Sequence, residues 1–111
     1  MEIKRCSIEG ADPYVLIDTL QSEMADNYSY RSDDLCIITT DKYLLRINSN
    51  LLSVVIVDFK DKYRIEIEII SGGGAVSFLR FDWSSEGSAN EKIMKIIRKT
   101  CEANSWNLFE K

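Results

Sequence analysis

Apolar and polar residues alternate near the start of the chain, over residues 3–8, which predicts a short strand. After these residues, the spacing of apolar positions changes to that of a helix. Asp12 and Pro13 form a helix start, because Asp accepts hydrogen bonds from free backbone amides and Pro lacks the amide that this position leaves unpaired. The helix is predicted to run to about Asn27. Its apolar stripe recurs every three or four residues and consists of Leu16, Ile17, Leu20 and Met24.

The middle of the chain has the pattern of antiparallel hairpins. Residues 28–34 are polar and carry tyrosines, and they are predicted to form a loop. The extended runs that follow are separated by connections so short that only hairpins can span them. These runs cover residues 35–40, 43–47, 51–59, 63–71 and 76–83. They form four or five strands, depending on whether the first two runs are separate. The three glycines at 72–74 are predicted to form a flexible hairpin or a bulge.

A second helix is predicted to begin at Ser88. Ser88 and Glu91 have the spacing of a capping box, in which each side chain bonds the backbone amide of the other residue. The helix should end near Asn104 and bury a stripe that consists of Ile93, Ile96, Ile97, Thr100 and Cys101. Behind it lies a short tail with three large apolar side chains, those of Trp106, Leu108 and Phe109. Because such a tail would fray in water, we expect it to pack back onto an apolar surface.

These elements predict a single α+β domain over residues 1–111, with a strand, a helix, an antiparallel meander and a helix in that order. Both helices should lie on one face of the sheet. This order resembles two known architectures, the TATA-binding-protein-like fold and the smaller helix-grip (START/Bet v 1-like) domains, in which a curved antiparallel sheet wraps a C-terminal helix. The resemblance rests on element order and implies a fold, since fold alone does not carry function.

Two of the predicted strands are apolar on both faces. In residues 51–59, Val54 and its same-face neighbours are as apolar as the residues that alternate with them, and residues 76–83 show the same pattern. The run 63–71 instead alternates between isoleucine and charge, as a strand with one solvated face does. Either the central strands are buried by their own domain, or a ligand cavity, a partner subunit or the tail covers the second face. A ligand cavity would be lined by Val54, Phe81 and Trp83.

Three further groups of polar residues are candidate sites. Ser85 and Ser88, in a segment predicted to join a strand to a helix start, have the small side chains and free amides that bind an anion, or else simply cap the helix. Glu66 and Glu68 share a strand face about 7 Å apart, a spacing suited to acid-base or metal chemistry or to a plain solvated face. A basic stripe on the last helix fits either nucleic acid or solvent, and it consists of Lys92, Lys95 and Lys99.

Histidine is absent from all 111 residues, which excludes the catalytic triads, zinc sites and proton shuttles that need an imidazole. We therefore assign no catalytic residue, and we expect neither a metal nor a cofactor. Cys6, Cys36 and Cys101 are odd in number and far apart, which indicates reduced, buried thiols. The net charge of −4 opposes binding to nucleic acid. No apolar run near the N-terminus suits a signal peptide or a membrane anchor, so we expect a cytoplasmic location.

Together these features favour a small binding or assembly domain over an enzyme. We expect a homodimer that associates through the second face of the sheet and that has the capacity for a small apolar or anionic ligand. The alternative is a small enzyme that uses the carboxylates of Glu66 and Glu68, with or without a metal ion. A nucleic-acid-binding module is the third candidate.

Overall fold

The computed structural model describes residues 2–24, 28–44, 49–61, 63–73 and 82–111, with side-chain surroundings for 2–24, 28–40, 52–61, 63–72 and 89–111. The chain begins with strand β1 (Glu2–Glu9) and helix α1 (Pro13–Met24), as predicted. Gly10 makes the turn between them at φ 79°, a conformation that favours glycine. Asp12 caps α1, since its Oδ1 accepts a hydrogen bond of 3.0 Å from the amide of Tyr14. The last predicted residues of this helix, 25–27, lie outside the described residues.

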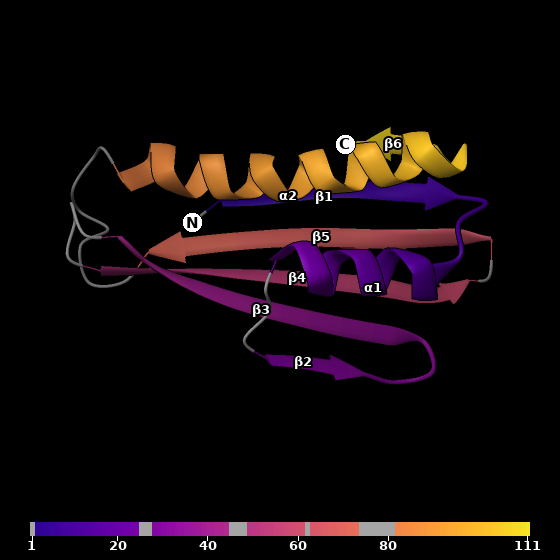
Figure 1. Cartoon of the computed structure of the whole chain (residues 1–111), viewed down its shortest axis with the longest axis horizontal. Coiled ribbons are helices and arrows are strands. Elements are labelled where there is room, and N and C mark those ends of the chain that lie inside the picture. Colours follow the sequence, from indigo (N-terminus) through magenta and orange to yellow (C-terminus); the bar gives the residue numbers. More distant parts are fainter. Residues whose placement is uncertain (1, 25–27, 45–48, 62, 74–81) are drawn as a thin grey trace.

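Strands β2 to β5 follow as a run of antiparallel hairpins, and their bounds are β2 (Tyr28–Arg31), β3 (Leu35–Leu44), β4 (Ser49–Asp61) and β5 (Arg64–Gly73). With β1 and the C-terminal strand β6 (Asn107–Glu110) they form one sheet in the order β2-β3-β4-β5-β1-β6. Every neighbouring pair is antiparallel. The first strand of the chain therefore lies between the last hairpin strand and the C-terminal strand (Figure 1).

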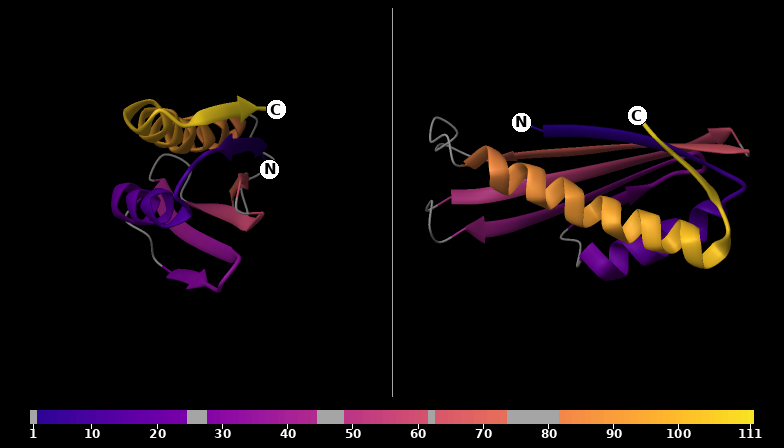
Figure 2. Two further views of the ribbon diagram at one scale, coloured as in Figure 1. Left: turned by 90° about the vertical axis from the view of Figure 1, so that its right-hand side faces the viewer. Right: turned by 90° about the horizontal axis from the view of Figure 1, so that it is seen from above.

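Helix α2 (Asp82–Asn104) and α1 both cover one face of this sheet and contact each other there. Figure 2 shows the sheet bent around the two helices, with its other face turned away from them. The core between helices and sheet is apolar, and its strand residues alternate with residues on the far face. Its fully buried large side chains are Ile8, Leu16, Ile17, Leu20, Ile38, Val55, Val57, Ile65, Ile69, Met94 and Ile97. The structure thus confirms the α+β class and the placement of both helices on one face.

The prediction of a loop over residues 28–34 is wrong for its first half. Tyr28–Arg31 forms the edge strand β2 and pairs with β3. The reason is that tyrosines alternate with smaller polar residues there, and aromatic side chains favour strands even on an exposed edge. Only the following residues turn, where the amide of Ser32 donates a hydrogen bond of 2.7 Å to the carbonyl oxygen of Leu35.

Two predicted boundaries in the sheet also differ from those observed. The runs 35–40 and 43–47 belong to one strand, β3, because the pairing with β4 continues without a break through Asp41 and Lys42. Gly72 and Gly73 extend β5 instead of forming a hairpin, and both pair with β4. Most of the strand predicted over 76–83 lies outside the described residues, and its last two positions, Asp82 and Trp83, already belong to α2.

Helix α2 begins at Asp82, six residues before the predicted capping box, so Ser88 lies within the helix. The sequence of the first turns is rich in acidic residues and serines, which suit the positive end of the helix dipole, whereas the interior glycine Gly87 costs the helix about 1 kcal/mol. The side chain of Glu91 forms an ion pair with Arg98, about two turns further along α2.

The C-terminal tail packs back on the domain, as expected, by forming the edge strand β6 beside β1. Ser105 reverses the chain after α2 at φ 59°, and the amide of Trp106 donates to the carbonyl oxygen of Cys101 at 2.9 Å. Trp106 and Leu108 then pack against the core. Arg98 links β6 to α2 through hydrogen bonds of 2.9 and 2.8 Å to the carboxylate of Glu110.

Candidate functional site

The face of the sheet turned away from the helices, here called the open face, is the largest surface that carries an unusual pattern of side chains. The strand register places its residues in rows across the sheet. One row reads Ile3, Ile70, Val54, Thr39 and Tyr28 from β1 to β2, and the next reads Arg5, Glu68, Ile56, Ile37 and Tyr30. Apolar side chains therefore gather over β3, β4 and β5, while charges gather toward β1.

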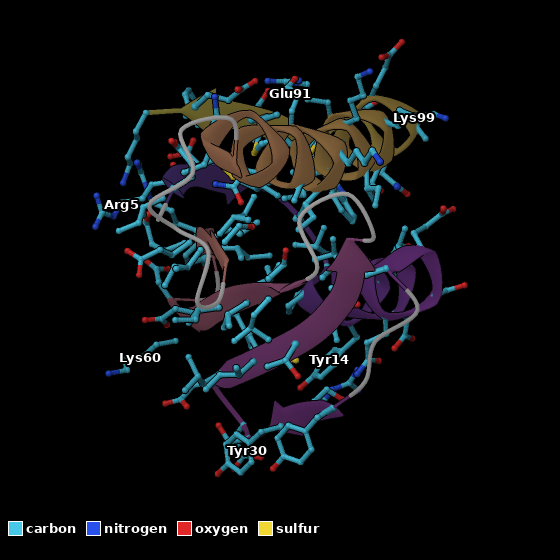
Figure 3. The ribbon with its side chains drawn as sticks, turned by 90° about the vertical axis from the view of Figure 1, so that its left-hand side faces the viewer. Arg5, Tyr14, Tyr30, Lys60, Glu91 and Lys99 are labelled. Carbon is cyan, nitrogen blue, oxygen red and sulfur yellow. The ribbon has the colours of Figure 1, made fainter. Side chains whose placement is uncertain are left out.

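The apolar part, here called the apolar patch, consists of Ile3, Ile37, Leu52, Val54, Ile56 and Ile70. Ile3 and Leu52 are each 49% exposed, and the other four are half-buried. Tyr28 and Tyr30 extend the patch onto β2 with 64% and 50% exposure. Figure 3 shows Tyr30 projecting from this edge strand, away from both helices. Contiguous exposed apolar side chains on a small domain mark a surface that binds another molecule.

The charged part, here called the charged cluster, consists of Arg5, Glu9, Arg64, Glu66, Glu68 and Lys111. Arg64 is its centre, with Nε donating to Glu66 at 2.9 Å and Nη1 donating to Glu9 at 3.2 Å. Its Nη2 donates to the buried hydroxyl of Ser7 at 3.0 Å, and its guanidinium lies 5.9 Å from the ring centre of Phe109. Arg64 and Phe109 together cover Ser7, which explains why a serine on this face has no exposed surface.

The rest of the cluster is also paired. Arg5 donates to Glu68 at 2.7 Å, and Lys111 donates to Glu66 at 3.0 Å. A shallow hollow of about 260 Å³ separates the cluster from the apolar patch, and Arg5, Glu66 and Ile56 are among its lining residues. Figure 3 shows Arg5 directed away from the helices, toward solvent. With three basic and three acidic members, the cluster carries no net charge.

Glu66 and Glu68 share the open face, as predicted, but their environment does not suit acid-base catalysis. The hydrogen bond from Lys111, followed by that from Arg64, lowers the pKa of Glu66 below its ordinary value, and partial burial offsets only part of this effect. A general acid needs the opposite shift. Within the part of the chain that the structure describes, no group of three metal-binding side chains is placed to hold an ion.

The residues predicted to bind a ligand are spread over both faces of the sheet. Val54 lies in the centre of the apolar patch. Trp83, Ser85 and Ser88 belong to α2, which packs on the opposite face, so Ser85 and Ser88 do not lie in a loop before a helix start. Phe81 lies outside the described residues. That these residues bind a ligand stays a prediction.

Sequence reasoning missed several residues of the open face. Tyr28 and Tyr30 were not identified because their segment was predicted to be a loop, although their two-residue spacing indicates a strand. Ile3 alternates with the buried residues of β1, so the sequence pattern could have placed it on the open face. Phe109 and Lys111 reach the charged cluster only because β6 pairs with β1, a contact that no local pattern reveals.

The three cysteines are buried and carry thiols that are not joined in disulfides. Burial is the main cause that raises the pKa of the Cys6 thiol to about 12, and burial also raises the pKa of Cys101. Neither thiol is therefore an activated nucleophile. The basic side chains of Lys92, Lys95 and Lys99 are exposed on α2, as predicted. None of the helices in the described ranges is long and apolar enough to cross a membrane.

Comparisons of the chain with protein-family models, with curated proteins and with solved structures find no match. No relative therefore supplies a substrate, a partner or a site residue. Among the described residues, the open face offers the most extensive surface on which the chain's own side chains indicate a binding role.

Proposed function

We propose that this protein is a binding and assembly domain that pairs with a second copy of itself through the apolar patch on the open face. The observation that supports this proposal most strongly is the exposure of the patch. Six aliphatic side chains and two tyrosines lie side by side on a face that no described element covers. Removing such area from water contributes about 25 cal/mol per Å², which favours association over solvation.

The charges on the open face support a second copy over a polyanion. The charged cluster is neutral, so two copies can meet there without like-charge repulsion, although the whole chain carries a net charge of −4. A nucleic acid or an acidic membrane would instead require a surplus of basic side chains beside the patch. The neutral cluster can form the polar rim that surrounds the apolar centre of many interfaces.

The size of the open face is also sufficient. The molecule measures 41 × 24 × 20 Å, and the sheet extends along the two longer dimensions (Figure 1). A face that spans both of these dimensions is large enough to contain an interface of standard size, which buries about 800 Å² per partner. A symmetric dimer would bury the same patch on both copies.

The finer fold and the location are part of the same proposal. The placement of β1 beside β5 and the bending of the sheet around α2 support a TATA-binding-protein-like or helix-grip arrangement. Three buried cysteines that form no disulfide with one another support a cytoplasmic location, where thiols stay reduced.

A matched pair of valine-to-lysine variants tests the dimer. Val54 lies in the apolar patch, whereas Val15 is an equally apolar residue on α1 with 41% exposure. Placing a lysine charge in an apolar interface costs several kcal/mol, so Val54→Lys should weaken self-association at least about 100-fold. Val15→Lys should leave association unchanged. The measurement is the molar mass by light scattering during size-exclusion chromatography over a series of loading concentrations.

The expected result is twice the chain mass for the wild type and for Val15→Lys, and the mass of one chain for Val54→Lys. Circular dichroism of each variant shows whether it has kept its fold. A wild-type protein that stays monomeric at the highest concentration would contradict the proposal. So would a folded Val54→Lys variant that associates as strongly as the wild type.

A further inference from the structure

We propose that the groove between α1, α2 and strands β3 and β4 binds a small zwitterion whose apolar body ends in a hydroxyl group. This groove lies on the helix-covered side of the sheet, so it is separate from the apolar patch. Its volume is about 290 Å³, and it is lined by Glu23, Met24, Thr40, Ser53, Ala89, Lys92, Ile93 and Ile96. That volume is close to the lower end of the range for small-molecule sites, about 300 Å³.

The floor of the groove is polar at a place where the rest of the core is apolar. Ser53 is only 4% exposed, and Thr40 lies beside it on the neighbouring strand. Buried hydrogen bonds connect Ser53 through Ser71 to Asn90. The hydroxyl of Ser53 lies 2.9 Å from that of Ser71, and Ser71 donates to the side-chain oxygen of Asn90 on α2 at 2.5 Å.

The direction of these hydrogen bonds determines what Ser53 offers to the groove. The carbonyl oxygen of Asn90 can only accept, so the single proton of Ser71 points toward it. Ser71 must then accept the proton of Ser53. The lone pairs of Ser53 remain available on the side of the groove. A ligand that reaches the floor must therefore bring a hydrogen-bond donor, and a hydroxyl group suits this position.

The rim of the groove carries two opposite charges on opposite walls. Glu23 extends from α1 and Lys92 from α2, and both side chains are exposed. Neither forms an ion pair with another described residue, in contrast to the fully paired charged cluster of the open face. A ligand's ammonium group could form an ion pair with Glu23, and its carboxylate could form one with Lys92. A zwitterionic head group matches this rim.

The walls between rim and floor are apolar. Met24, Ile93 and Ile96 form them, and the thioether of Met24 favours contact with an aromatic ring. An amino acid with a phenolic side chain therefore has the required parts in the required order: charged head, aromatic body and terminal hydroxyl. L-Tyrosine is the probe that carries all three.

Isothermal titration of the full-length chain with four probes tests the site. L-Tyrosine should bind, and L-phenylalanine, which lacks the terminal donor, should bind about tenfold more weakly. Tyramine lacks the carboxylate and 3-(4-hydroxyphenyl)propanoate lacks the ammonium group. Each should therefore lose a comparable factor relative to L-tyrosine.

Three variants assign the contacts. Ser53→Ala should abolish the preference for tyrosine over phenylalanine, and Lys92→Gln should weaken the binding of tyrosine without changing that of tyramine. Lys99→Gln is the matched control, because Lys99 is an exposed lysine of the same helix that does not line the groove. Binding of L-tyrosine that is undetectable at millimolar concentration would overturn the proposal. Binding that neither Ser53→Ala nor Lys92→Gln alters would overturn it as well.

Discussion

Glu66 holds two basic side chains of the charged cluster together, those of Arg64 and Lys111. Because its pKa is lowered in the folded chain, its contribution to stability is complete above its ordinary pKa of about 4.5 and is lost as the pH falls through the lowered value. Glu66→Gln should therefore reduce the free energy of unfolding by up to about 1 kcal/mol near neutral pH, since the group is partly exposed. Urea titrations at neutral and acidic pH measure this difference.

In acid below the lowered pKa of Glu66, the difference between wild type and Glu66→Gln should be much smaller, because the wild-type carboxylate has lost its charge. Glu102→Gln is the control, since Glu102 is exposed on α2 and makes no ion pair with the described residues. It should change stability little at either pH. A loss for Glu66→Gln that is as large in acid as at neutral pH would show that the ion pairs are not its cause.

Ser105 adopts the left-handed conformation at the end of α2, with φ 59°. A residue with a side chain destabilises the fold by about 1 kcal/mol when its backbone is left-handed, and glycine avoids this cost. Ser105→Gly should therefore raise the free energy of unfolding by about 0.5 to 1 kcal/mol. The same substitution at the exposed helix position Ser22 should lower it by about 0.5 kcal/mol. Thermal and urea unfolding of both variants would contradict this account if the two changes had the same sign.

At the scale of elements, local patterns predicted those parts of the fold that local chemistry decides. Asp12 and Pro13 correctly predicted the start of α1. The alternation of isoleucine with charged residues correctly predicted that one face of β5 lies in the core. The start of α2 was predicted wrongly because Ser88 and Glu91 match a capping box, yet the helix begins earlier at Asp82. Helix propensity is a weak signal that tertiary packing overrides.

The candidate site could be predicted only in part, for a related reason. The apolar residues on both faces of β4 identified Val54 as a member of a second apolar surface. The charged cluster, in contrast, depends on β1 lying between β5 and β6, which are far apart along the chain. The strand order of a sheet is set by long-range packing, so no local pattern could place Arg64 beside Phe109.

Strand β6 makes a testable contribution as an element. Deleting residues 107–111 would remove the packing of Leu108, the Arg98–Glu110 pair and the cover over Ser7, and it would expose the edge of β1. The free energy of unfolding should fall by about 2 to 4 kcal/mol. Glu110→Gln keeps the strand and loses only the ion pairs, so it should cost less than about 1 kcal/mol. Urea unfolding measures the free energy of unfolding of both variants. A truncated chain as stable as the wild type would show that β6 does not stabilise the domain.

On the scale of the whole molecule, one core holds all three cysteines between sheet and helices. Their labelling by a thiol reagent should therefore require unfolding of the domain. Under native conditions at mildly alkaline pH, the observed rate should follow the fraction of unfolded chain as urea is added, and all three thiols should react together. One thiol that reacts rapidly in the absence of urea would show that the core opens locally around it.

As proposed above, two copies of the chain associate through the open face. The most direct measurement is an isotope-filtered nuclear Overhauser experiment on an equal mixture of labelled and unlabelled protein, which detects only contacts between copies. We predict signals between copies from the methyl groups of Leu52, Val54 and Ile56 and from the ring of Tyr30. Signals confined to the outer surfaces of α1 and α2, or no signals between copies at millimolar concentration, would contradict the account.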